Sequence, residues 1–197
     1  MNYLAHAWLS FHQPFVLAGN MISDFVKGKQ QYAYPAPVQQ GIRLHRSIDA
    51  FSDSHPVTRE AKIYFRSSAG LYSGAFVDIV YDHFLALDEH ELSESEWQLF
   101  SQEVYSQLTA QQDILPQRFA AMFPYMKEQD WLFNYRYHWG IRNSFGGLVR
   151  RAKYLQDAEA PFQAFLEHYD KLGLLYREFF PAVKKHALDQ LSEHPIL

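Results

Sequence analysis

Apolar residues recur at steps of three and four along almost the whole chain, and this pattern constrains the fold more than any other feature. One such run follows steps of four, three and four at Val38, Ile42, His45 and Asp49. Another runs from Gly74 through Val77, Val80, Tyr81, Phe84 and Leu85. This period belongs to helices, and no strand-like alternation persists. The sequence therefore predicts an all-α fold, a helical bundle.

Prolines divide this pattern into separate helices. They stand where a helix would begin or break, at Pro14, Pro35, Pro37, Pro56, Pro116, Pro124 and Pro161. Ser93 and Glu96 form a capping-box pattern at the head of a helix that we expect to run to about Leu108. We expect roughly seven to nine helices. Because no repeat, Ser/Gly linker or like-charge tail divides the chain, residues 1–197 are expected to form a single domain.

Composition narrows the chemistry that is open to this chain. With no cysteine in 197 residues, disulfides, zinc fingers, iron–sulfur clusters and thiol nucleophiles are excluded. Any bound metal must be held by His, Asp or Glu. Lys and Arg number 18 against 22 Asp and Glu, and this net charge of −4 argues against a general nucleic-acid partner.

The segment from Asn2 to Ser23 carries no Lys, Arg, Asp or Glu. It resembles a signal peptide or membrane span at first sight, but it contains His6, His12 and Asn20, and no basic region precedes it. We therefore interpret it as buried helix. The protein is expected to be cytoplasmic, without a membrane partner.

Acidic and imidazole side chains gather in three short stretches of the first half. The first contains Asp24, the second His45 and Asp49, and the third Asp78, Asp82 and His83. Residues four apart lie on one face of a helix, so each pair can direct two ligands to one point. Two such helices facing each other would form a His/Asp cage suited to Mn²⁺, Mg²⁺ or Fe²⁺.

A structural interpretation stands beside this one, because His/Asp pairs at this spacing are frequent on exposed helices. The context of Asp78 favours the metal: Phe76, Val77, Ile79 and Val80 flank it. Burying several unpaired carboxylates is costly unless a cation holds them. His6, by contrast, sits alone in an apolar helix, as a core histidine would, and Asn20 follows Gly19 at an expected turn, where Asn commonly caps a helix.

Four ordered motifs carry a resemblance to a known family. They are Met1-Asn-Tyr-Leu-Ala-His6, then Gly19-Asn20-x-x-x-Asp24-Phe-Val-x-Gly28, then Gly41-Ile-x-x-His45-Arg46-x-Ile-Asp49, and Asp78-x-x-x-Asp82-His83-Phe84. Together they resemble the acyl carrier protein phosphodiesterases. Trp131-Leu132, Tyr135-Arg136, His168-Tyr169-Asp170 and Phe179-Phe180-Pro181 extend the resemblance to nearly the whole chain.

The resemblance implies an all-helical fold like that of HD-domain metal phosphohydrolases, with Mn²⁺-dependent activity. It implies hydrolysis of the phosphodiester that joins 4′-phosphopantetheine to a serine of holo acyl carrier protein. A metal would neutralise the phosphoryl oxygens and lower the pKa of a bound water to about 7. The order Asp82-His83 reverses the usual His-Asp dyad of HD domains.

Residue roles follow from the resemblance and the chemistry together. The metal candidates are Asp24, His45, Asp49, Asp78, Asp82 and His83, not all of which need touch the ion. His6, Arg46 and Asn20 are the catalytic candidates. Arg46 would clamp the phosphate or form a structural bridge, and His6 would donate a proton or complete the metal shell.

Residues 131–156 contain no Asp or Glu and hold five basic side chains, namely Arg136, Arg142, Arg150, Arg151 and Lys153. Tyr135, Tyr137, Trp139 and Phe145 are interleaved with them. Because carrier proteins of this kind are strongly acidic, we expect this stretch to bind the carrier. The alternative is a helix face whose acidic partners lie elsewhere in the fold.

Two other functions are open to the same sequence. One is an HD-like metal phosphohydrolase that acts on a small nucleotide or phosphate ester. The other is a non-catalytic helical module that binds carrier protein or another acidic partner. The sequence does not set the number of metal ions or the oligomeric state.

Overall fold

The structure, a computed structural model, describes residues 1–193 and confirms the all-α prediction, with no strand among them. The last four residues of the expected 1–197 domain lie outside the described residues. The α-helices are α1 (Tyr3–Trp8), α2 (Pro14–Ile22), α3 (Ala36–Ser54), α4 (Pro56–Ala69), α5 (Ser73–Ala86), α6 (Glu94–Ala110), α7 (Gln117–Glu128), α8 (Trp131–Asn134), α9 (His138–Arg151), α10 (Glu159–Glu167) and α11 (Tyr169–Glu193). Short 3₁₀ helices cover Ser23–Phe25 (η1), Gly28–Ala33 (η2), Gly70–Tyr72 (η3) and Gln112–Ile114 (η4).

The eleven described α-helices exceed the seven to nine that the sequence predicted. Helix α1 has 6 residues and α8 has 4, and such lengths are too short to show a helical period. Prolines predicted several of the starts: Pro14 begins α2 and Pro56 begins α4. The capping box at Ser93 is also confirmed, since its backbone N–H donates to Oε2 of Glu96 at 2.8 Å.

One predicted boundary was wrong. Pro124 lies inside α7 and does not end it. Phe123 and Met126, on either side of this exposed proline, are both buried in the core. Their packing holds the helix together despite the backbone hydrogen bond that proline removes.

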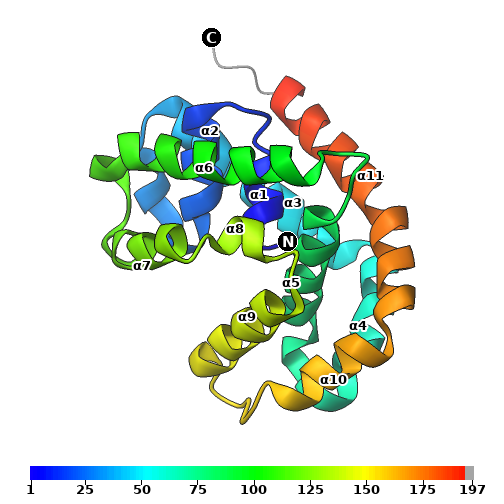
Figure 1. The fold of residues 1–197 in the computed structure, drawn as a ribbon. Coiled ribbons are helices and arrows are strands. Elements are labelled where there is room, and N and C mark those ends of the chain that lie inside the picture. The colour runs from blue at the N-terminus through cyan, green and yellow to red at the C-terminus, as the bar shows by residue number, and fades with distance from the viewer. Residues whose placement is uncertain (194–197) are drawn as a thin grey trace.

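Helices α3 and α5 lie at the centre of the fold (Figure 1). Helix α2 packs along α3, while α1 contacts both α2 and α5. Helix α11 runs along the outside of α3, α4 and α5. Helix α9 packs against α5, α8 and α10. The buried apolar side chains of the described residues form one cluster that these helices share.

Most of the charge-free segment is buried, as predicted, but residues 12–15 are exposed and the segment forms two helices. Helices α1 and α2 are joined by a turn in which Phe11 and His12 have positive φ angles of 48° and 56°. The Gly19-Asn20 pair lies within α2 and not at the expected turn. Across residues 1–193, no helix combines the length and apolar character needed to cross a membrane.

The closest helix contact joins α2 and α3 through two glycines. A Cβ at Gly19 would lie 2.0 Å from the carbonyl oxygen of Val38, and a Cβ at Gly41 would lie 2.1 Å from that of Val16. Both neighbours are backbone atoms, which a side-chain rotation cannot move aside. Only glycine on both helices allows their backbones to approach this closely.

We predict that Gly41→Ala lowers the free energy of unfolding by about 3 kcal/mol or more, because the new methyl group would force α2 and α3 apart. Gly146→Ala in α9 is the matched control, since a Cβ there meets only Arg150 at 3.5 Å. It should stabilise the protein slightly through better helix propensity. Chemical denaturation measures both; equal stabilities of the two variants would contradict the close contact.

Candidate active site

Three elements bring histidine and carboxylate side chains to one point. His6 comes from α1, Asp24 from η1, and His45 and Asp49 from successive turns of α3. Nε2 of His6 lies 3.2 Å from Oδ1 of Asp49, and Nε2 of His45 lies 3.2 Å from Oδ2 of the same carboxylate. Asp24 approaches from the other side, with Oδ1 3.4 Å from Nε2 of His45.

Asn20 fixes the orientation of His45. Its backbone carbonyl accepts a hydrogen bond of 2.7 Å from Nδ1 of His45, which places the proton of a neutral ring on Nδ1 and leaves Nε2 as a lone pair. The side-chain amide of Asn20 donates to the carbonyl of His6 at 2.8 Å and to Oγ of Ser10 at 3.0 Å. Asn20 thus ties both histidine-bearing segments to α2.

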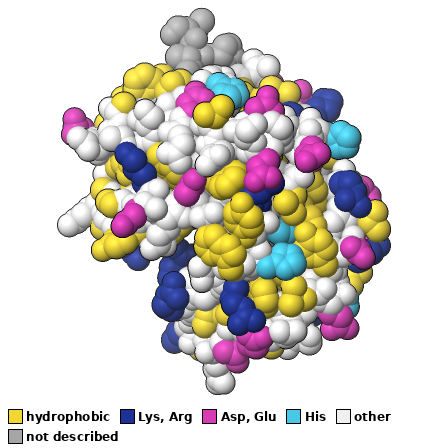
Figure 2. Space-filling view, in the orientation of Figure 1, with side chains coloured by type: hydrophobic (Ala, Val, Ile, Leu, Met, Phe, Trp, Pro, Cys, Tyr) yellow, Lys and Arg dark blue, Asp and Glu magenta, His cyan; other side chains and the backbone are white. Residues whose placement is uncertain are grey.

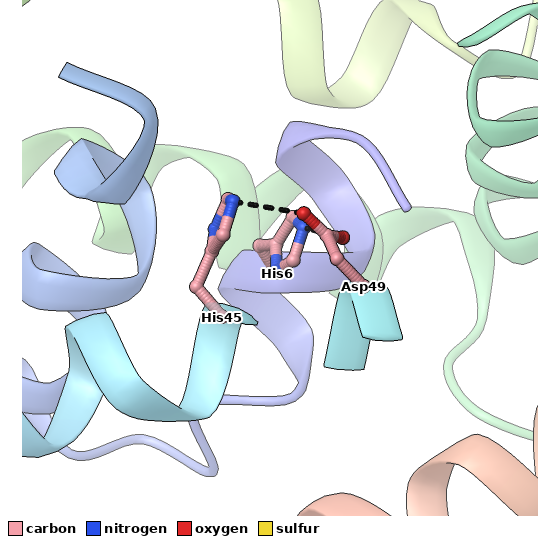
Figure 3. A group of neighbouring side chains, drawn as sticks. All are labelled: His6, His45 and Asp49. Atoms are coloured by element: carbon pink, nitrogen blue, oxygen red, sulfur yellow. Dashed lines mark ion pairs between the residues drawn. The ribbon is translucent and has the colours of Figure 1, made fainter. Parts of the chain in front are cut away.

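The two imidazole rings stack on each other. Their centroids are 3.8 Å apart with an interplanar angle of 13°, and both histidines are buried. Figure 3 shows both rings beside the carboxylate of Asp49. Both ring nitrogens of His6 and Nε2 of His45 are buried without a well-formed hydrogen bond.

Burial and neighbouring charge act differently on the two histidines. Burial and then the nearby His45 lower the pKa of His6 to about 4, against the opposing effect of Asp49. Burial also lowers the pKa of His45, but Asp24 and Asp49 outweigh it and raise that pKa to about 9. Although burial raises the pKa of Asp49, its contacts with His45 and His6 bring that pKa well below the usual range.

These residues fit a divalent metal ion. His6, His45 and Asp49 each offer a ligand atom, and these atoms lie within 4.8 Å of one another. Imidazole nitrogen and carboxylate oxygen form a donor set that suits first-row divalent ions. The buried nitrogens that lack a hydrogen bond are the atoms that such an ion would engage, and the Asn20 carbonyl supports His45 as outer-sphere partners commonly do.

The group opens to solvent through a cleft of about 330 Å³. Asp24, His45, Arg46 and Asp49 line it, together with residues of η1 and the start of η2. The guanidinium of Arg46 donates to Oε1 of Gln31 and to the carbonyl of Val26, both at 3.0 Å. An arginine has five N–H donors, so Arg46 keeps others for an anion in this cleft.

The carboxylates of α5 have other partners. Oδ1 of Asp78 lies 2.9 Å from the amino group of Met1, which also lies 3.4 Å from Asp49. Asp82 accepts hydrogen bonds from the backbone amides of Asn2, Leu4 and Ala5 at 3.2, 2.7 and 3.3 Å. Burial raises the pKa of Asp82 to about 7 against the lowering effect of these contacts.

His83 points to a different part of the molecule. Its Nδ1 donates to the carbonyl of Tyr135 at 2.7 Å, and its Nε2 accepts from the hydroxyl of Tyr169 at 2.8 Å. The six metal candidates therefore do not converge as one cage. Residue 83 follows 82 by about 100° around α5, so the two side chains cannot share a face.

A comparison with known proteins places the chain in a family. Residues 1–183 match the family model described as acyl carrier protein phosphodiesterase. The chain belongs to the acyl carrier protein phosphodiesterase family. A relative of this name from Photorhabdus laumondii is 31% identical over 188 residues, which cover 95% of each chain. Relatives of the same name from Yersinia pestis and Enterobacter sp. are 31% and 32% identical over 95% of this chain and 97% of their own. No solved structure matches, so the likeness to HD-domain folds stays a prediction.

The basic stretch of this family member divides into two groups. Arg136 pairs with Glu94 at 2.9 Å, and Arg142 pairs with Glu159 at 3.2 Å. Arg136 and Arg142 therefore follow the alternative interpretation, in which the acidic partners of this basic stretch lie elsewhere in the fold. Arg150 and Arg151, at the end of α9, have no ion pair with a carboxylate of residues 1–193, and Lys153 follows them.

Sequence reasoning missed the amino group of Met1 and the tyrosine partners of His83. The Met1 contact involves the backbone, which carries no residue-specific signal. Tyr135 and Tyr169 do lie in motifs of the family resemblance, at Tyr135-Arg136 and His168-Tyr169-Asp170. These motifs were the available signal, but nothing in their spacing connects them to position 83.

We predict that acid weakens the fold through His83. Burial lowers the pKa of His83 to about 4, whereas an unfolded histidine has a pKa near 6.5. Between these values the unfolded chain binds a proton that the folded chain excludes. As pH falls through this window, the free energy of unfolding should drop by up to about 3 kcal/mol from this residue alone.

Denaturation of metal-free protein across this pH range measures the effect. His83→Gln should be less stable than the parent and show a shallower loss of stability towards low pH. His90→Gln, at an exposed position, is the control and should follow the parent. A parent-like slope in His83→Gln would show that His83 does not set this pH dependence.

Proposed function

We propose that this chain hydrolyses the phosphodiester linking 4′-phosphopantetheine to the serine of holo acyl carrier protein, giving apo carrier and free 4′-phosphopantetheine. The observation that supports this most is the group His6, His45 and Asp49, whose ligand atoms lie within 4.8 Å of one another beside an open cleft. The relatives with this named activity match nearly the full length of the chain.

In this proposal His6, His45 and Asp49 hold a divalent ion, and Asp24 completes the group from η1. Mn²⁺ is the first candidate, with Mg²⁺ and Fe²⁺ as alternatives. Such an ion supplies charge neutralisation at the phosphoryl oxygens and lowers the pKa of a coordinated water molecule. Asp78 and Asp82 support the group indirectly, because they hold the start of α1, which carries His6.

The remaining roles follow from the contacts of each side chain. His6 places Nε2 3.2 Å from Oδ1 of Asp49, within the group that would hold the ion, so we assign it to the metal and not to proton donation. Arg46 uses its remaining N–H donors to hold a phosphoryl oxygen in the cleft. Asn20 is a positioning residue, since its carbonyl orients His45.

We predict that purified protein converts holo carrier to apo carrier with Mn²⁺ and not with excess EDTA. Asp49→Asn should lower the rate by about 100-fold or more, because it weakens the carboxylate that lies 3.2 Å from both histidines. A gel-shift assay follows the conversion. The same variant should lose the rise in melting temperature that Mn²⁺ gives the parent.

Asp53→Asn is the matched control. Asp53 lies one turn further along α3, is exposed, and pairs with Lys62 at 2.7 Å. This variant should keep both the activity and the response to Mn²⁺. Parent protein that is folded, binds Mn²⁺ and leaves holo carrier intact would contradict the proposed substrate, and small phosphate esters would then become the leading alternative.

We place the carrier at the end of α9, because Arg150, Arg151 and Lys153, unlike Arg136 and Arg142, form no ion pair with a carboxylate of residues 1–193. Figure 2 shows Lys and Arg side chains gathered over this part of the molecule. Trp139, also on α9, is 54% exposed and stacks on Tyr137. Exposed aromatic side chains on the same helix as exposed arginines are typical of surfaces that bind acidic protein partners.

Replacing Arg150 and Arg151 with Glu should reduce kcat/KM for holo carrier by about tenfold or more, because the new charges repel an acidic partner. Hydrolysis of a small phosphodiester such as bis(p-nitrophenyl) phosphate should change little. The same substitution at Arg59 and Arg177, exposed on α4 and α11, controls for net charge. An undiminished rate on holo carrier would contradict this docking surface.

A further inference from the structure

A second cavity, of about 340 Å³, lies where the start of α1 meets α8 and α9. This volume falls in the range of small-molecule sites, which is about 300–1,000 Å³. Its walls come from three elements. The start of α1 contributes Asn2 and Tyr3, the end of α8 contributes Asn134, and α9 contributes Trp139, Asn143 and Arg151. Figure 2 shows a hollow on this face, between α9 and the helices above it.

The lining has a definite chemical character. The lining residues include no Asp or Glu. They do include the amide side chains of Asn2, Asn134 and Asn143. The rings of Tyr3 and Trp139 supply apolar surface beside them. Amide groups together with aromatic surface suit an uncharged chain that carries amide bonds between methylene groups.

The cavity adjoins the candidate active site through the first residues of the chain. Asn2 and Tyr3 line it, and the amino group of the preceding Met1 lies 3.4 Å from Asp49. Burial raises the pKa of Tyr3 to about 12; Arg151 opposes this shift and Asp24 adds to it. Tyr3 and Arg151 both line the cavity.

We propose that this cavity receives the arm of the prosthetic group, the amide-bearing pantetheine chain on the far side of the phosphodiester. This inference rests on the proposed function. The scissile phosphate lies at the His6, His45 and Asp49 group, and the arm extends past the start of α1 into the cavity.

Two neighbouring glycines of α9 allow a matched test. Gly147 lines the cavity, and a Cβ there meets only Nη2 of Arg150 at 3.6 Å. Gly146 is not among the lining residues, and a Cβ there meets only Nη1 of Arg150 at 3.5 Å. A Cβ makes only ordinary van der Waals contacts at both positions, and of the two glycines only Gly147 lines the cavity, so we expect only Gly147→Leu to place a side chain there.

The first measurement is binding of free pantetheine, which has no phosphate, by isothermal titration calorimetry. The parent and Gly146→Leu should bind it alike, and Gly147→Leu should bind it about tenfold more weakly or worse. Inorganic phosphate should not compete with it. Thermal melting establishes that both variants are folded.

The second measurement is hydrolysis. Gly147→Leu should reduce kcat/KM for holo carrier by about tenfold or more and leave bis(p-nitrophenyl) phosphate hydrolysis unchanged, whereas Gly146→Leu should spare both. If the parent converts holo carrier but does not bind pantetheine, or if both leucine variants behave alike, the cavity assignment is wrong while the proposed function stands. If the parent hydrolyses bis(p-nitrophenyl) phosphate but not holo carrier, the proposed function itself fails.

Discussion

The contact between Gly19 and Gly41 determines the geometry on which the candidate site depends. Because neither helix has a Cβ at this point, the backbones of α2 and α3 approach until carbonyl oxygens occupy the side-chain positions. This approach brings the carbonyl of Asn20 to Nδ1 of His45, one turn of α3 beyond Gly41. The same turn spacing places Asp49 against His45, so a packing constraint also sets the direction of the ligand atoms.

Helix α1 depends on a second constraint, the buried carboxylate of Asp82. The helix has only 6 residues, and Asn2 forms no side-chain cap at its start. Asp82 supplies the missing acceptor by binding three backbone amides of this first turn, so a residue of α5 caps a helix 77 or more positions away. The acidic residues of α5 thus have partners in the chain itself, and His6 is held in place by them.

Local sequence patterns predicted much of this architecture. Helical periodicity, prolines and the Ser93 capping box predicted the fold class and several helix starts, because each acts within a few residues. The i,i+4 pair His45 and Asp49 does meet at one point, and Asp24 joins it. The patterns failed at Pro124, where buried neighbours outweigh a local helix breaker, and at His83, whose partners Tyr135 and Tyr169 come from distant segments.

The sequence by itself determined the helical class, the exclusion of cysteine chemistry and the set of residues from which a site is built. Only the tertiary structure decided how those residues divide: His6 joins the His45 and Asp49 group, Asp82 caps α1, and His83 joins the tyrosines. It likewise separated Arg136 and Arg142, which are paired, from Arg150 and Arg151. The physical reason is that a side chain's role depends on the groups across the helix interface, and sequence spacing specifies only neighbours on the same helix.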